Sequence, residues 1–277
     1  MQNLIGLKSI SFLTFLVLSV LMYSCSSDLD DLGYSTDKDH IKSISSNGTI
    51  QHRYYYDQTG KIIEENCLFY FKKYIYDEKK RLVKVESAFD HNMYSSLYIP
   101  PRTEFMTSKN SAVDSYDLFH YDETGRLSKT EHFFNETGKV FEYRSMRKFE
   151  YKGGNIIREN LHNPTGQITQ YHVYTYDENG NVTCDKYYSN LFGSKDELIS
   201  ETFFKHDNYK NPYRILSMTI SPGLFTNANN IIETYTIRYD DIPGIDNAPS
   251  SKTTYEYNEK GYPVKEITKD SVFEYNY

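Results

Sequence analysis

Short segments of alternating apolar and polar residues, each closed by a polar turn, fill most of the chain. The clearest turn is Tyr176-Asp177-Glu178-Asn179-Gly180-Asn181-Val182. Asp177 suits the first position of a type I turn because its carboxylate can accept a backbone N–H, and Gly180 suits a position of positive φ. A three-residue loop closed by a bulge would then set Tyr176 opposite Val182. The heptad therefore predicts a tight β-hairpin.

The same heptad recurs along the chain. Two close copies begin at Tyr56-Asp57 and Tyr121-Asp122, with their glycines at Gly60 and Gly125. A third copy begins at Tyr76-Asp77 and has Lys80 where glycine is expected, so Lys80 needs positive φ, or another loop, at a cost of about 1 kcal/mol. Opposite charges across the turn would help to fix the register in these copies. Degenerate copies begin at Phe134, Tyr151, His162 and Tyr257.

These units resemble the YD repeats of Rhs-type proteins and of many lipoproteins from the Bacteroidota. The segment His206-Asp207-Asn208-Tyr209-Lys210-Asn211-Pro212-Tyr213 is similar to a turn found in such lipoproteins. The resemblance covers residues 41–277 as a pattern and implies an antiparallel, rolled or barrel-like β-fold, in families of unknown function. No stretch of residues 121–176 sustains helical spacing. We predict one all-β domain over residues 41–277, an antiparallel meander of YD-type hairpins.

The N-terminus has the pattern of a secretion signal over residues 1–24. Lys8 precedes the apolar run Ile10–Met22, which is too short for a membrane span of about 20 residues. The run ends in Leu21-Met22-Tyr23-Ser24-Cys25, which resembles a bacterial lipobox. The resemblance implies cleavage before Cys25 and acylation of that residue, and three acyl chains would anchor it firmly. An ordinary secreted protein, cut nearby, is the alternative.

An acidic segment follows the lipobox. The run Ser26–Asp31 resembles the export signal that sends Bacteroidota lipoproteins to the outer face of the outer membrane, and it would equally serve as a solvated tether. We interpret residues 25–40 as an acidic flexible tether. The expected location is the outer membrane, with the barrel facing the exterior; the periplasmic face is the alternative.

Three segments interrupt the alternation, and we predict loops at residues 88–112, 185–200 and 221–230. The candidate binding residues are aromatic side chains of the first two, namely Tyr94, Tyr98, Tyr187 and Tyr188. The last strand ends in alternating aromatic residues, which resembles the terminal signal of outer-membrane barrels. Charges on both faces of the predicted strands, at Lys72, Lys73, Glu150 and Lys152, argue against a wall embedded in lipid.

Composition narrows the classes of partner. The chain has 28 tyrosines, 16 phenylalanines and no tryptophan, which fits either exposed stacking platforms or a repeat whose consensus contains tyrosine. The net charge is −7, and Lys8 is the only charged residue before Cys25, so a chain that begins at Cys25 carries −8. A nucleic-acid-binding surface would need a basic face, so we expect no nucleic-acid partner.

Catalytic and metal-binding motifs do not stand out. The eight histidines have no metal-ligand spacing, and a turn role already explains Asp57, Asp77, Asp122 and Asp177. The sequence lacks a Gly-x-Ser-x-Gly elbow, a phosphate-binding loop and a His–Glu metalloprotease motif. We therefore expect no catalytic residue, metal or cofactor. Cys67 and Cys184 could pair in an oxidising envelope, although two separate thiols fit their differing positions after the turns better.

Two main functional hypotheses follow. The first is a non-catalytic lipoprotein that binds a glycan or a partner protein through tyrosines and long loops. The second is a hydrolase of a polysaccharide or envelope polymer, with two carboxylates of raised pKa meeting inside the rolled sheet. A purely structural shell is the third.

Overall fold

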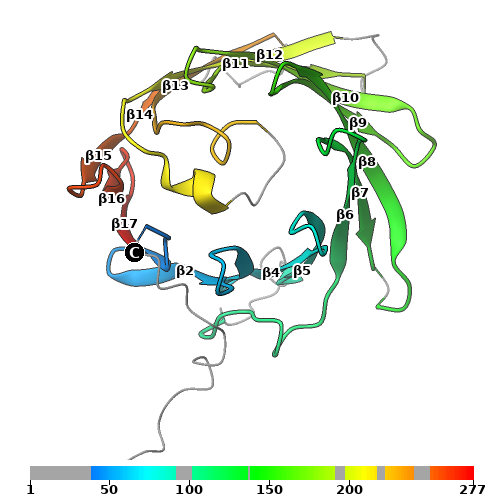
Figure 1. The fold of residues 1–277 in the computed structure, drawn as a ribbon, viewed down its shortest axis with the longest axis horizontal. Coiled ribbons are helices and arrows are strands. Elements are labelled where there is room, and N and C mark those ends of the chain that lie inside the picture. The colour runs from blue at the N-terminus through cyan, green and yellow to red at the C-terminus, as the bar shows by residue number, and fades with distance from the viewer. Residues whose placement is uncertain (1–38, 92–101, 137, 191–196, 217–221, 240–249) are drawn as a thin grey trace, which may run out of the picture.

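The computed structural model describes residues 39–91, 102–136, 138–190, 197–216, 222–239 and 250–277, and these residues form a β-barrel (Figure 1). Within these ranges the chain forms 17 strands. They are β1 (Ser43–Ser46), β2 (Thr49–Tyr56), β3 (Ile62–Cys67), β4 (Tyr70–Tyr76), β5 (Leu82–Phe89), β6 (Ser115–Tyr121), β7 (Leu127–Phe134), β8 (Glu142–Lys152), β9 (Asn155–His162), β10 (Ile168–Tyr176), β11 (Val182–Ser189), β12 (Glu197–His206), β13 (Ile231–Arg238), β14 (Ser251–Lys252), β15 (Thr254–Tyr257), β16 (Pro263–Ile267) and β17 (Val272–Asn276).

The strands follow one another around the ring as an antiparallel meander. Each strand from β1 to β13 pairs with the next, up to β14, and β15, β16 and β17 form a second series. Strand β17 pairs with β1, with Tyr275 opposite Ile44, so the two ends of the meander meet. The ladder between β13 and β14 has only two residue pairs. The sheet is therefore a nearly closed barrel, and the predicted fold class is confirmed.

The hairpin turns have the predicted geometry. Tyr176 lies opposite Val182 after a bulge, and Gly180 has a φ of 84°. Lys80 has a φ of 61°, so a lysine holds the left-handed conformation that glycine holds in the other copies. The heptad therefore reverses the chain even where its glycine is missing.

The main apolar core lies on the inner face of the barrel, towards one side. Its buried members are Ile41, Ile44, Tyr54, Tyr56, Ile62, Tyr74, Val85, Phe119 and Tyr275. The connection between β12 and β13, which contains the short 3₁₀ helix η2 (Pro212–Leu216), turns into the ring (yellow in Figure 1). Tyr213 and Phe225 of this connection pack against the core. This inward connection fills part of the lumen and leaves the rest to a cavity.

The predicted loops are partly wrong. Residues 185–189 belong to β11 and residues 197–200 to β12, so most of the loop predicted at 185–200 is strand. The predicted loop 221–230 is confirmed for residues 222–230, which contain no strand. Within the predicted loop 88–112, residues 88 and 89 end β5.

Several predicted features lie outside the described residues, namely the signal segment 1–24, Cys25, most of the tether 25–40, Tyr94 and Tyr98. At the end of the tether, His40 is buried against the ring of Tyr56, at 4.7 Å between ring centroids, and Asp39 pairs with Lys260. The described residues include no apolar helix of a length that could cross a bilayer.

Candidate ligand site in the barrel lumen

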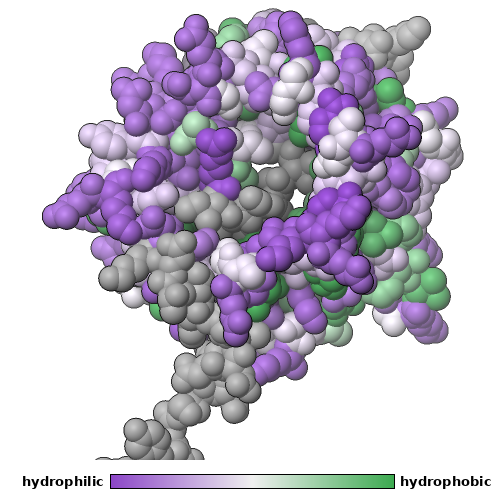
Figure 2. Space-filling model, in the orientation of Figure 1, coloured by the Kyte–Doolittle hydropathy of each residue, from purple (hydrophilic) through white to green (hydrophobic). Residues whose placement is uncertain are grey.

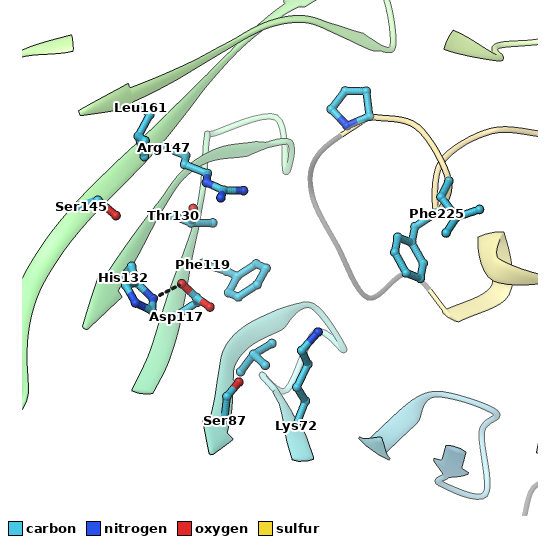
Figure 3. A pocket seen from close by; sticks show the side chains of 13 residues that line it. Lys72, Ser87, Asp117, Phe119, Thr130, His132, Ser145, Arg147, Leu161 and Phe225 are labelled. Atoms are coloured by element: carbon cyan, nitrogen blue, oxygen red, sulfur yellow. Dashed lines mark hydrogen bonds and ion pairs between the residues drawn. The ribbon is translucent and has the colours of Figure 1, made fainter. Parts of the chain in front are cut away.

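A cavity of about 640 Å³ lies inside the barrel, between the wall from β4 to β9 and the connection that turns inward (Figure 3). Seen down the barrel axis, the molecule is hollowed at its centre, and the described residues at the rim of the opening are mostly hydrophilic (Figure 2). The wall contributes both polar and apolar side chains, and the connection contributes apolar ones. The lining residues are Lys72, Val85, Ser87, Asp117, Phe119, Thr130, His132, Ser145, Arg147, Leu161, Pro222, Leu224 and Phe225.

Strand alternation and register bring the polar residues together. Successive side chains of a strand point to opposite faces, and residues opposite each other on neighbouring strands share a face. Asp117 of β6 lies opposite His132 of β7, which lies opposite Ser145 of β8. The three therefore form a row across the wall, and Nδ1 of His132 lies 3.0 Å from Oδ1 of Asp117.

Lys72 enters the cavity in front of a buried glutamate. The side chain of Glu65 is only 4% exposed, and its carboxylate accepts hydrogen bonds from the hydroxyls of Tyr70 at 2.6 Å and Tyr74 at 3.2 Å. Burial favours the neutral acid, but the hydrogen bond with His52 and the charge of Lys72 lower the pKa of Glu65. Glu65 is therefore ionised at neutral pH, and Lys72 Nζ lies 3.9 Å from it.

Arg147 has a similar setting farther round the wall. Glu159, whose side chain is 6% exposed, accepts a hydrogen bond of 3.2 Å from the hydroxyl of Tyr174 and lies 3.3 Å from Nη1 of Arg147. The side chains of Lys72 and Arg147 are 31% and 47% exposed, and both point into the cavity (Figure 3). The lumen thus presents two cations in front of buried carboxylates.

The outer face of the same strands carries ion pairs. Because Val85 and Ser87 line the cavity, Lys84 and Glu86 point outward, and they pair at 2.7 Å. On the neighbouring strands, Glu131 pairs with Lys129 at 2.7 Å and with His120 at 2.8 Å. Further round, Lys186 pairs with Glu201. The outer wall of the barrel therefore carries charges along β5, β7, β11 and β12.

The two candidate tyrosines that are described, Tyr187 and Tyr188, lie on opposite faces of β11. Tyr187 lies opposite His172 and stacks on its ring at 4.9 Å, on the face that lines the lumen. Tyr188 stacks on Tyr171 at 4.5 Å, on the outer face. Because both belong to a strand, they cannot act as one loop surface, and only Tyr187 shares a face with the cavity.

The repeat-turn residues serve the hairpins. Oδ1 of Asp122 accepts hydrogen bonds from the N–H and the hydroxyl of Thr124 and from the N–H of Arg126, at 2.6–2.9 Å. The Thr124 hydroxyl and the Arg126 N–H lower the pKa of Asp122 to about 2. Asp57 and Asp177 likewise accept hydrogen bonds from the backbone N–H groups two and four residues later. Asp77 accepts from the N–H and the guanidinium of Arg81. These aspartates cap turns, as the sequence indicates.

The two cysteines lie apart from the cavity lining. Cys67 ends β3 and Cys184 lies in β11; both are buried with free thiols, and burial raises the pKa of each. Among the described residues, no group of three or more His, Cys, Asp or Glu side chains could hold a metal ion.

The lumenal row Asp117–His132–Ser145 was not predicted, although the chain carries a signal for it. Counting back from the Tyr121 turn, with a bulge at its base, sets Asp117 opposite His132. Leu224 and Phe225 have no such signal, because a connection that enters the lumen is positioned by contacts distant in sequence.

Comparison with known proteins bears on the fold. Neither a protein-family model nor a curated protein matches the chain. Among solved structures, a porin-like protein from Bacteroides vulgatus superimposes with a TM-score of 0.50 at 12% identity, over 86% of this chain and 98% of that one. A porin-like protein from Bacteroides uniformis gives a TM-score of 0.39 at 9% identity, over 88% and 99%. The TcdB2-TccC3-Cdc42 structure gives 0.22 at 12% identity, over 79% and 14%. At these identities, the likeness to the Bacteroides vulgatus protein concerns the fold alone.

Proposed function

We propose that this chain is a non-catalytic lipoprotein of the cell envelope, anchored in the outer membrane through Cys25. Its barrel is surrounded by water, not by lipid, and binds a glycan in its lumen. The observation that carries the proposal is the composition of the cavity lining. Glycans present hydroxyls and apolar C–H faces, so their sites combine convergent polar groups with aromatic or apolar side chains. The lumenal cavity offers both, in Asp117, Thr130 and Ser145 and in Phe119 and Phe225.

The size and shape of the cavity support a small ligand. Ligand sites commonly measure about 300–1,000 Å³ and are concave, and the cavity has about 640 Å³. A short oligosaccharide fits this volume. A folded protein partner would instead need an exposed contact surface, so we favour the glycan over a protein partner.

The charges on the outer wall favour a barrel that is surrounded by water over one that is embedded in lipid. A transmembrane barrel turns an apolar band to the lipid and keeps its polar residues inside. Here the outward pairs Lys84–Glu86 and Lys129–Glu131 lie in the middle of their strands, where charges in lipid are costly. Attachment through a lipidated Cys25 requires no lipid contact of the barrel itself.

The hydrolase alternative has a weaker basis. Two-carboxylate glycoside hydrolysis needs a pair of acidic groups about 5–10 Å apart, and Asp117 is the one carboxylate in the described lining. The row Ser145–His132–Asp117 has the order of nucleophile, base and orienting acid. Within the described structure, however, Ser145 makes no hydrogen bond to His132, so the serine is not activated.

Glycan-array and calorimetric binding with the chain from residue 26 onward tests the binding proposal. We expect saturable binding to an oligosaccharide, which Phe119→Ala weakens and which Tyr116→Ala, on the outer face of the same strand, leaves unchanged. A chain that retains no glycan would contradict the proposal. Labelling of Ser145 by a fluorophosphonate, abolished in Ser145→Ala, would favour the hydrolase instead.

Anchoring and sidedness need a separate experiment in cells. Cys25→Ala should abolish incorporation of labelled palmitate and release the protein from the membrane fraction. Protease added to intact cells should digest the wild-type barrel if it faces the exterior. A protected barrel would indicate the periplasmic face, and continued labelling of Cys25→Ala would contradict the lipid anchor.

A further inference from the structure

We infer that the lumenal site selects acidic glycans, and that Lys72 and Arg147 each bind a carboxylate or sulfate group of such a ligand. The inference rests on the proposed function, because it names the class of glycan that the same cavity would bind. It starts from the two cations on the cavity wall and from what lies behind each of them.

The same arrangement occurs twice on the wall. A buried glutamate receives tyrosine hydroxyl bonds and lies behind a cation whose side chain is partly exposed to the cavity. Glu65 holds Lys72 on β4, and Glu159 holds Arg147 on β8. Because tyrosine hydroxyls hold the glutamates in place, the glutamates orient the cations without lining the cavity themselves. Pre-oriented charges lose little conformational entropy when they bind a ligand.

The accessible charge of the lining is positive although the whole chain carries −7. Glu65 and Glu159 are buried and do not line the cavity. Asp117 does, and it is engaged by His132 at 3.0 Å. Among the described lining residues, a ligand therefore meets Lys72 and Arg147 with one carboxylate, which already has a partner. In a partly enclosed cavity these charges act more strongly than on an open surface.

The chemistry of the two cations suits a carboxylate or a sulfate. A guanidinium presents several N–H donors in a fixed plane, so Arg147 can donate to a ligand from one edge while it pairs with Glu159 from another. Lysine supplies a compact charge with three donors. Lys72 lies 3.9 Å from Glu65, whose oxygens already accept from two tyrosines, so its ammonium can also approach a ligand.

The apolar part of the lining completes the site. Phe119 lies between the two cations along the wall, and Phe225 faces them from the inward connection (Figure 3). Leu224 of the same connection also lines the cavity. An acidic sugar has one charged edge and an apolar C–H face, which matches this division. A free inorganic anion would leave the apolar side without a partner.

Calorimetry with matched ligands tests the inference. The first pair is trigalacturonate and its methyl ester, which differ in charge and little in size; the second is a sulfated disaccharide and its desulfated form. Since hydrogen bonds to charged groups are stronger, we expect the wild-type chain to bind the charged member of at least one pair about tenfold more tightly. Added salt should reduce this preference.

Variants then assign the preference to the two cations. Lys72→Gln and Arg147→Gln should each remove most of the preference while binding of the uncharged ligand persists. Lys84→Gln and Arg158→Gln, on the outer face, are the matched controls and should preserve it. The double variants Glu65→Gln/Lys72→Gln and Glu159→Gln/Arg147→Gln leave no unpaired buried carboxylate, so they keep the test valid if a single variant folds poorly.

The outcomes separate the inference from the proposed function. Equal binding of the charged and uncharged members of both pairs would overturn the inference and leave glycan binding intact. A preference that survives both double variants would also overturn it. Binding of none of these ligands, nor of any other glycan, would overturn the proposed function and the inference with it.

Discussion

The hydroxyl of Tyr121 donates a hydrogen bond of 2.8 Å to the carbonyl oxygen of Leu82, 39 residues earlier in the chain. Tyr121 opens one heptad and Leu82 closes the preceding one. The same bond joins other heptads whose turns are neighbours at the same end of the barrel, as Tyr76 to Ile62, Tyr151 to Leu127 and Tyr176 to Ile156. These four tyrosines therefore attach their own hairpins to the neighbouring hairpin that precedes them at that end of the barrel.

A second contact accompanies this bond. The guanidinium of Arg81, next to Leu82, lies 4.8 Å from the centroid of the Tyr121 ring. Lys61 lies 4.8 Å from the ring of Tyr76, and Arg126 lies 5.0 Å from that of Tyr151. The tyrosine, the cation and the final aliphatic residue of the heptad thus serve the junction between repeats, as well as the turn. This explains why tyrosine recurs in the consensus without a ligand.

Removing one such hydroxyl should loosen one junction. Tyr121→Phe leaves the carbonyl of Leu82 without this donor and should lower the free energy of unfolding by about 1 kcal/mol. Urea denaturation followed by circular dichroism measures the change. Tyr116→Phe, on the outer face of the same strand, is the control and should have little effect. Equal losses in both variants would mean that the junction bond contributes no more than the hydroxyl of Tyr116, for which the described structure shows no such bond.

Lys80 tests the turn itself. Its φ of 61° strains a residue with a Cβ, so Lys80→Gly should raise the free energy of unfolding by roughly 0.5–1 kcal/mol. Lys79→Gly, in the same turn but without positive φ, should instead lower it, because glycine adds freedom to the unfolded chain. Equilibrium urea curves of both variants give the two signs. A destabilised Lys80→Gly would contradict the strain argument.

The turn aspartates predict a loss of stability in acid. The pKa of Asp122 is about 2 in the folded chain, below its ordinary value of 3.8, so its carboxylate stabilises the fold above that ordinary value. This contribution should disappear as the pH falls from about 4 to about 2, because over this range the unfolded chain binds a proton at Asp122 that the folded chain does not yet bind. Urea midpoints measured across this range follow the loss.

Asn163 suggests the matched variant for that experiment. It occupies the same position in its own heptad, and its Oδ1 accepts from the N–H groups of Thr165 at 3.1 Å and Gln167 at 3.0 Å. Asp122→Asn should therefore keep the turn and lack the part of the acid dependence that belongs to Asp122. If wild type and variant lose stability in parallel from about pH 4 to pH 2, the proposed contribution of Asp122 is absent.

The fold was predictable because each heptad encodes its own reversal. Asp177 and Gly180 specify a turn from local chemistry, and a series of such turns yields a meander without long-range information. The closure of the barrel was harder to predict from the sequence, because the pairing of β1 with β17 joins Ile44 to Tyr275 across nearly the whole chain. The inward course of Tyr213 and Phe225 likewise depends on tertiary packing.

The loop predicted at 185–200 was wrong for a specific reason. Tyr187-Tyr188-Ser189-Asn190 has aromatic residues side by side and polar residues after them, which is not the alternation of a strand with one buried face. Strand β11 packs half-buried aromatic rings on both faces, against His172 inside and Tyr171 outside, so adjacent tyrosines are compatible with it. Two-sided packing removes the period-2 signal on which the prediction depended.

Those two tyrosines give the sharpest test of lumenal binding. Tyr187 shares the inner face with His172 and is positioned to stack on a glycan that extends beyond the cavity past β9 and β10, whereas Tyr188 faces outward. Tyr187→Ala should weaken oligosaccharide binding roughly three- to tenfold, as expected for one lost stacking contact. Tyr188→Ala removes the stack on Tyr171 and should lower the free energy of unfolding while leaving the dissociation constant of the oligosaccharide unchanged.

Calorimetric titration of both variants with one oligosaccharide, at a temperature where both are folded, separates the two effects. Weaker binding by Tyr188→Ala alone would move the site to the outer wall.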